Sequence, residues 1–170
     1  MIKFLAGVIF GIGLLLLAGY LFVTRGGLVM STDAKPLPFE RSLAHKALAA
    51  AIGKSEKDES PLPADEANLL AGAHIYEDSC AGCHGHFGQG ASGLSKRVYP
   101  HIPPLLPPAK GVTDDPVGET HWVVQNGIRF SAMPSFRSKL NENEMWQVSL
   151  LLHQADKLPV AVQAALRPKQ

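Results

Sequence analysis

The stretch CAGCH, residues 80–84, contains the only two cysteines of this 170-residue chain, Cys80 and Cys83, with His84 directly after the second. Cysteines separated by two residues are poor structural staples, so the pair is more consistent with a chemical role than with a disulfide framework. The pattern occurs in redox dithiols, in zinc sites, and in haem attachment with an iron ligand beside the anchors. The rest of the sequence has to distinguish among these three.

The composition is that of an ordinary globular protein, with 46% hydrophobic residues, 18% charged residues and a formal net charge of +1. Without a basic excess, no nucleic-acid partner is expected. No segment alternates convincingly with period two, whereas several segments follow the helical period. The soluble part is therefore expected to be all-α, with a few helices and long loops.

The apolar run Phe4–Val23 contains no charged residue and is 20 residues long, which gives a helix of roughly 30 Å, the thickness of a bilayer core. The run ends in Tyr20, Phe22 and Arg25, which are interpreted as interfacial and charged anchors, and no Ala-x-Ala cleavage pattern follows. Residues 1–25 are therefore interpreted as an uncleaved transmembrane anchor rather than a signal peptide.

The remainder divides into a linker at 26–63, a dense domain at 64–160 and a C-terminal tail at 161–170. The linker is expected to contain a short alanine-rich helix at about 39–53, followed by a charged, proline-punctuated segment. Within the dense domain, one helix leads into CAGCH. A second starts at Asp115-Pro116, with Asp115 as N-cap, and a third opens at Asn141 with Glu144 three residues on. The long loop 85–108 is rich in Gly and Pro, and a large buried ligand would explain it.

A haem held through two thioethers needs two cysteines spaced for its vinyl groups and a histidine at the next position to reach the iron. Cys80, Cys83 and His84 meet this requirement. An opposite axial ligand must come from elsewhere, and methionine there raises the reduction potential relative to histidine. Of the four methionines, Met133 alone lies in a loop of the dense domain, fixed by the following Pro134. His101 and His121 are alternatives for this position.

A redox dithiol and a zinc site fit the sequence less well. A thioredoxin-type dithiol expects the motif at the start of a helix after a strand, whereas here it ends a helix in an all-α chain. A zinc site made from Cys80, Cys83, His84 and His86 would be crowded, and no second CxxC pair exists. One covalently attached haem c is therefore predicted.

Four stretches resemble the class I mono-haem cytochromes c, and more narrowly the membrane-anchored cytochromes c of bacterial respiratory chains. They are LLAGAHIYEDSCAGCHG (69–85), YPHIPPLL (99–106), HWVVQNGIRFSAMPSF (121–136) and NENEMWQVSLLL (141–152). The resemblance implies a class I cytochrome c fold in which Gly72 or Ala73, with Tyr76, meets Trp146 where the first and last helices cross. It also implies that Pro103, Pro104 and Leu105 line the histidine side of the haem. Ser131–Ala132 departs from the Thr–Gly that often precedes the methionine.

Iron ligated by His84 and Met133 has no open position for a small-molecule substrate, so the expected activity is single-electron transfer rather than enzyme catalysis. Expected partners are membrane lipid, through the N-terminal helix, and redox proteins or a respiratory complex. The expected location is the bacterial inner membrane, single-pass, with the haem domain on the periplasmic side. Alternatives are a subunit of a stable oxidoreductase complex, a haem-based sensor with labile Met133 ligation, and a small peroxidase-like enzyme.

Overall fold

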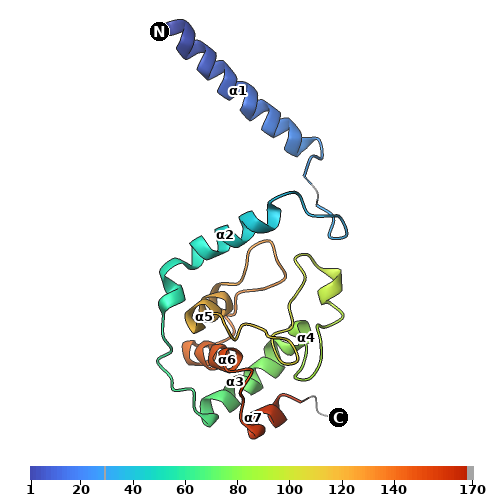
Figure 1. Cartoon of the computed structure of the whole chain (residues 1–170), viewed down its shortest axis with the longest axis vertical. Helices are drawn as coiled ribbons and strands as arrows, with labels where there is room; N and C mark the ends of the chain where they lie inside the picture. The colour runs from blue at the N-terminus through green and yellow to red at the C-terminus, as the bar shows by residue number, and fades with distance from the viewer. Residues whose placement is uncertain (29, 168–170) are drawn as a thin grey trace. The chain divides into compact units, whose positions relative to one another are not determined.

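The computed structural model describes residues 1–28 and 30–167, and in these ranges the chain is helical with no β-strand (Figure 1). The predicted all-α fold class is confirmed. The chain forms two compact units, Met1–Arg41 and Ser42–Gln170. Part of the predicted linker, from Ser42 onward, thus belongs to the second unit. The predicted domain boundaries themselves stay a prediction.

The first unit contains the helix α1, Ile2–Thr24, which is exposed along its length. At ~1.5 Å per residue, its 23 residues are enough to cross the ~30 Å core of a bilayer. It is the one helix among the described residues that is long and apolar enough to do so. The structure thus contains a helix of the predicted kind at the predicted place.

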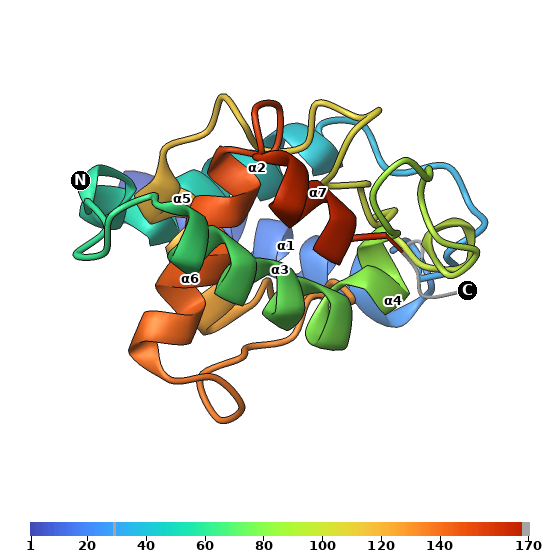
Figure 2. The ribbon, with the colours of Figure 1, turned by 90° about the horizontal axis from the view of Figure 1, so that it is seen from below.

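The second unit begins with most of α2, Glu40–Ile52, which continues directly into the 3₁₀ helix η1, Gly53–Lys57. The remaining helices are α3 (Glu66–Ser79), α4 (Ala81–His84), η2 (Ser95–Arg97), α5 (Val117–Asn126), α6 (Glu142–His153) and α7 (Val160–Ala165). The segment interpreted as a tail therefore contains α7, which packs against α3 through the fully buried Val162 (Figure 2). Residues 168–170 lie outside the described residues.

Helix ends follow local capping chemistry. Asp65 caps α3 by accepting a hydrogen bond from the Asn68 amide, 2.9 Å away. Asn141 and Glu144 form the predicted reciprocal capping box on α6, with distances of 3.1 and 2.8 Å. The expectation for α5 was wrong by one position. Its N-cap is Pro116, in extended conformation, so Asp115 lies outside the helix and makes no cap.

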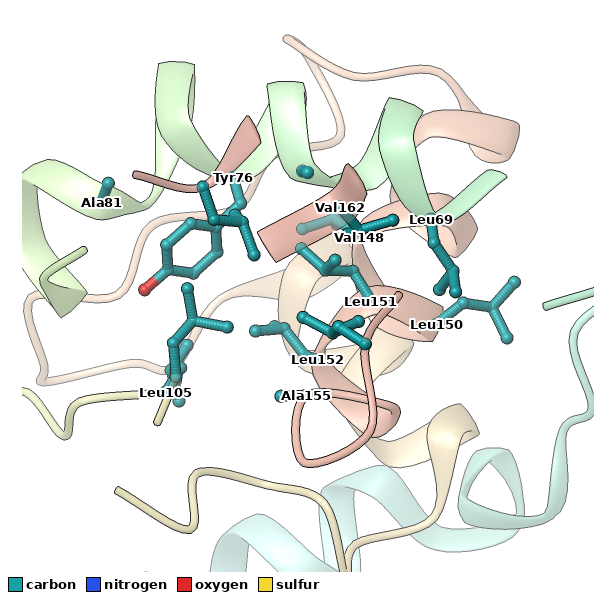
Figure 3. Packing of buried hydrophobic residues seen from close by; sticks show 14 of the residues in the cluster. Leu69, Tyr76, Ala81, Leu105, Val148, Leu150, Leu151, Leu152, Ala155 and Val162 are labelled. Atoms are coloured by element: carbon teal, nitrogen blue, oxygen red, sulfur yellow. The ribbon is translucent and has the colours of Figure 1, made fainter. Parts of the chain in front are cut away.

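The hydrophobic core lies where α3 crosses α6 (Figure 3). Gly72 of α3 sits at this crossing, because a Cβ there would clash with the backbone oxygen of Gln147 and lie 3.1 Å from the Cβ of Leu151. The implied crossing at a small residue is therefore present. Trp146, however, stacks on His121 of α5. The side chains that fill the core most completely are Tyr76, Leu106, Val148, Leu151, Val162 and Leu166.

Candidate functional site

The CAGCH motif forms a single tight turn at the end of α3. Cys80 is the C-cap of α3, and its amide donates to the carbonyl oxygen of Tyr76 at 2.8 Å. The amides of Cys83 and His84 both donate to the carbonyl of Cys80, at 3.0 and 2.9 Å. Both thiols are free and half-buried. The turn therefore carries two thiols and one imidazole on five consecutive residues, anchored to the core by α3.

His84 has one ring nitrogen fixed and the other available. Its Nδ1 lies 2.7 Å from the carbonyl oxygen of Pro103, and because a carbonyl only accepts, Nδ1 must carry the proton. The lone pair is then on Nε2, the arrangement found in metal-ligating histidines, where a backbone carbonyl sets the tautomer and ring orientation. Burial lowers the pKa of His84 and so favours the neutral form, which is the form that binds metals. The hydrogen bond to Pro103 acts in the opposite direction. Pro103 lies against His84, as the resemblance implied.

Cys80 is placed in less polar surroundings than an exposed thiol. Desolvation by burial raises its pKa to about 12, although Lys139 acts in the opposite direction. In the folded chain, therefore, this thiol is protonated and a poor nucleophile.

The chain leaves the motif through a glycine held by a buried tyrosine. The Tyr76 hydroxyl donates to the carbonyl oxygen of Gly85 at 2.7 Å, and burial is the main reason that the pKa of Tyr76 is raised. Gly85 has φ of 86°, and a Cβ on it would clash with the carbonyl of Gly90. Ser92 then donates to the carbonyl of Cys83 at 2.6 Å. These bonds fold the start of the long loop back onto the CAGCH turn.

Met133 lies half-buried in a loop that hydrogen bonds close upon itself. The amide of Ile128 donates to the carbonyl of Met133 at 3.1 Å. The Ser131 hydroxyl donates to the carbonyl of Ile128 at 2.7 Å and accepts from the Met133 amide at 3.1 Å. Ser131, the residue that departs from the family pattern, is thus the one whose side chain orders the loop around the methionine.

The same loop is tied to the end of α5. The amide of Phe136 donates to the carbonyl of Val124 at 3.0 Å, and the Ser135 hydroxyl to that of Gln125 at 2.6 Å. Gly127 ends α5 with φ of 69°, and a Cβ there would lie 2.9 Å from the Met133 carbonyl oxygen. Since α5 packs on α6 and α6 crosses α3, the elements carrying Met133 and the CAGCH turn share one core.

The two histidines that are alternative sixth ligands differ from each other. The Nδ1 of His101 lies 2.9 Å from the carbonyl oxygen of Ser95, so its Nε2 carries the lone pair, as in His84. His121 is buried between α5 and α6, with its Nε2 3.1 Å from Oε1 of Glu142. That nitrogen is nevertheless without a hydrogen bond, because its geometry does not direct an N–H at the carboxylate. The contact with Glu142 is therefore electrostatic.

A zinc site receives no support from the placement of donors. The Nδ1 of His86 is paired with the carboxylate of Glu77 at 2.8 Å. Across residues 1–28 and 30–167, no group of three or more His, Cys, Asp or Glu side chains is arranged to hold a metal ion. Two thiols, an imidazole with a free Nε2 and a thioether in an ordered loop are instead the donor set that a haem c requires.

Sequence reasoning missed three features around this site. The pairing of Glu77 with His86, the bond from Tyr76 to Gly85, and the packing of His121 on Trp146 all join residues whose partners depend on tertiary structure. The sequence did offer one local signal for the cluster around Trp146. Glu142 and Trp146 are four residues apart on α6 and so lie on the same side of the helix, and Trp146 Nε1 donates to Glu142 at 3.0 Å.

Residues 67–150, about half of the chain, match the family described as cytochrome C oxidase, cbb3-type, subunit III. No curated protein and no solved structure matches the chain. The family match covers both the CAGCH turn and the Met133 loop. Residues 67–150 are therefore a domain of the class I mono-haem cytochrome c type, which supports a haem-containing electron-transfer protein, and the N-terminal apolar helix is consistent with the membrane-anchored type.

Proposed function

We propose that this protein is a membrane-anchored mono-haem cytochrome c that transfers single electrons between periplasmic or membrane respiratory redox partners. One haem c, attached through Cys80 and Cys83, would supply an iron centre that cycles between two oxidation states. The iron would be ligated by His84 and Met133. The observation that carries this proposal is the hydrogen bond from His84 Nδ1 to Pro103, which leaves Nε2 as the available ligand beside two free thiols.

Several residues of the chain would position the ligands of such a site. Pro103 orients the His84 ring and keeps Nε2 unprotonated, while the turn at the end of α3 holds the two cysteines at fixed spacing. Ser131 holds the Met133 backbone, which limits how far the thioether can move. A fixed ligand set lowers the reorganisation that accompanies electron transfer, because neither ligand has to be repositioned when the charge changes.

Charged residues support a docking role for the surface near these loops. Lys96, Arg97, Arg129, Arg137 and Lys139 are exposed, whereas Lys110 is paired with Asp114 at 2.7 Å. An acidic redox partner would be attracted to such a surface, with an effect on the association rate that weakens as salt rises. The helix α1 would hold the domain beside the inner membrane, on the periplasmic side.

A stable subunit of a membrane oxidoreductase is the second candidate. It is favoured by the description of the matching family, whose members are named as a subunit of a cbb3-type oxidase. Mild detergent extraction separates the two candidates. A mobile carrier is expected to be extracted alone, whereas a subunit would be extracted with membrane proteins at fixed stoichiometry.

The redox spectrum tests the proposal directly. The oxidised wild-type protein should be low-spin, with a sulfur-to-iron charge-transfer band that Met133→Ala abolishes. Cys80→Ala combined with Cys83→Ala should remove covalent haem staining of the denatured chain. A high-spin native spectrum with ready binding of carbon monoxide would exclude the carrier function, and staining that persists in the double variant would exclude the attachment.

A further inference from the structure

The segment between α2 and α3, residues 53–62, lies against the haem domain, although its sequence reads as a charged linker. We refer to this segment as the strap. It starts after Ile52, which is only 5% exposed, and ends at Leu62, which packs against the core cluster. Between these two points, η1 packs on α5. The strap is therefore fixed at both ends and in the middle.

The middle of the strap packs against Gly118. It is buried in the first turn of α5. A Cβ at this position would clash with the carbonyl oxygen of Ser55 and lie 2.6 Å from the carbonyl oxygen of Asp58. All of these are backbone atoms, which cannot move aside as a flexible side chain can. The strap can therefore approach α5 this closely only because residue 118 has no side chain.

The contacts around Gly118 are incomplete. Asp58, Glu59 and Pro61 of the strap, with His121 and Trp146, line a pocket of about 460 Å³. Unfilled space reduces the contacts that hold the two surfaces together. The strap thus packs on backbone atoms at Gly118 and borders a solvent-open pocket beside that contact, where it makes fewer contacts with α5 and α6.

Like charges also face one another across the strap. Glu142 of α6 lines the same pocket as Asp58 and Glu59. The pKa of Glu119 of α5 is raised mainly by burial, and also by the negative charges of Asp115 and of Glu56 on the strap. The other charged or titratable groups here are Lys54 and Lys57 on the strap, Asp115 just before α5, and the buried His121 of α5. Repulsion between carboxylates opposes docking and is screened by salt. A segment with few buried contacts and opposing charges belongs to the low-stability end of a structure, where local opening occurs.

We propose that the strap is a reversible clamp that sets how far the haem domain can move from the membrane. The inference rests on the membrane anchoring in the proposed function. With the strap docked, α2 moves with the haem domain, and only the chain between Thr24 and Glu40 is a free tether, with an expected span of about 20 Å as a coil. With the strap released, the tether extends to the start of α3 and its span rises to roughly 35 Å.

The test uses the full chain in lipid nanodiscs and the variant Gly118→Ala. Alanine favours helix over glycine, so this change would tighten α5 if nothing rested on it. Gly93→Ala is the matched control, because a Cβ there meets nothing within 4 Å. Trypsin cleavage after Lys54 and Lys57 reports strap opening, with a synthetic peptide of residues 50–65 as the fully open reference.

The wild-type strap should be cleaved much more slowly than the peptide, and Gly118→Ala should raise the cleavage rate by about tenfold. Cleavage of the wild type should slow between ~0.01 M and ~0.15 M salt, as the Debye length falls from ~30 Å to ~8 Å, after correction with the peptide. Wild-type cleavage as fast as the peptide, a Gly118→Ala rate equal to that of Gly93→Ala, or no salt effect would overturn the proposal.

The reach itself is measured by quenching of a fluorophore on the lipid headgroups by the haem. Gly118→Ala should weaken the quenching relative to wild type and to Gly93→Ala, and equal quenching would overturn the proposed effect on reach. Failure of the proposed function can be distinguished from failure of the strap proposal. A chain without haem gives no quenching in any variant, while the trypsin measurement still reports the strap.

Discussion

The imidazole of His121 lies flat against the indole of Trp146, with ring centroids 3.8 Å apart and planes inclined by 7°. Oε1 of Glu142 lies 3.1 Å from the imidazole Nε2 and accepts the indole N–H at 3.0 Å. This cluster joins α5, which carries the Met133 loop, to α6, which crosses α3. Burial lowers the pKa of His121, although Glu142 and Asp58 act in the opposite direction.

The stability of the protein should therefore fall on mild acidification. A histidine whose pKa is lowered in the folded state binds its proton less readily there than in the unfolded chain, where the pKa is ~6.5. Stability is then complete above that value and declines as the pH falls from it toward the folded-state pKa. His121→Phe keeps a flat ring on Trp146 and should flatten this part of the profile. Chemical denaturation across this range measures it, and an unchanged slope in the variant would exclude His121 as the cause.

Gly72→Ala should destabilise the domain by about 1–3 kcal/mol, the usual cost of inserting a methyl group into a well-packed core. The new Cβ would clash with the backbone of Gln147 where α3 meets α6. Thermal unfolding followed by circular dichroism gives the change, with Gly93→Ala as the control in open space. Equal unfolding temperatures for the two variants would mean that the helices do not cross this closely.

Ser131→Ala should make the sixth ligand easier to displace. It removes both hydrogen bonds of the Ser131 hydroxyl, each worth ~0.5–1.5 kcal/mol, without touching Met133 itself. Imidazole should therefore bind the ferric protein on the order of tenfold more tightly than it binds wild type. Ser131→Thr retains the hydroxyl and should restore the wild-type affinity. An equal gain in imidazole affinity in Ser131→Ala and Ser131→Thr would point to packing rather than to hydrogen bonding as the cause.

Phe130→Gly should stabilise the folded chain. Phe130 has φ of 60° while its side chain is 92% exposed, so it bears left-handed backbone strain without the benefit of burial. Relieving ~1–2 kcal/mol of strain, less the ~0.5–1 kcal/mol of extra chain entropy that glycine brings, leaves a gain of about 0.5–1 kcal/mol. Urea denaturation measures the gain. Phe136→Gly, at a residue packed against the core, should instead be destabilising.

Local chemistry explains which elements the sequence predicted. The capping box of Asn141 and Glu144 and the CAGCH turn depend on residues within four positions of one another, so their geometry can be inferred directly. The start of α5 was misplaced because the extended backbone of Pro116 delays the first helical residue to Val117. The packing of the strap and the helix α7 were not anticipated, because both segments lack a helical period in the sequence. Their conformation depends on distant surfaces, such as Gly118 for the strap and α3 for α7.

The candidate site divides in the same way. The identities of Cys80, Cys83, His84 and Met133 as site residues follow from motif chemistry and resemblance, and they stay predictions. The partners that would tune them, such as Ser131 on its own loop and Pro103 beside His84, depend on how the loops fold. The spacing of motif residues in the sequence identifies the types of ligand. The residues that surround these ligands can be identified only from the folded structure.

The meeting of Gly72 with Gln147 also sets an order of events during synthesis. Because these residues are far apart in the chain, α3 has no partner for its glycine face until α6 has been made. The CAGCH segment leaves the ribosome well before that and remains outside a closed core in the meantime. A haem attached during this interval would meet both thiols on an open chain, before burial in the folded domain raises the pKa of Cys80. The late crossing of the two helices would thus leave an interval in which covalent modification is unhindered by the fold.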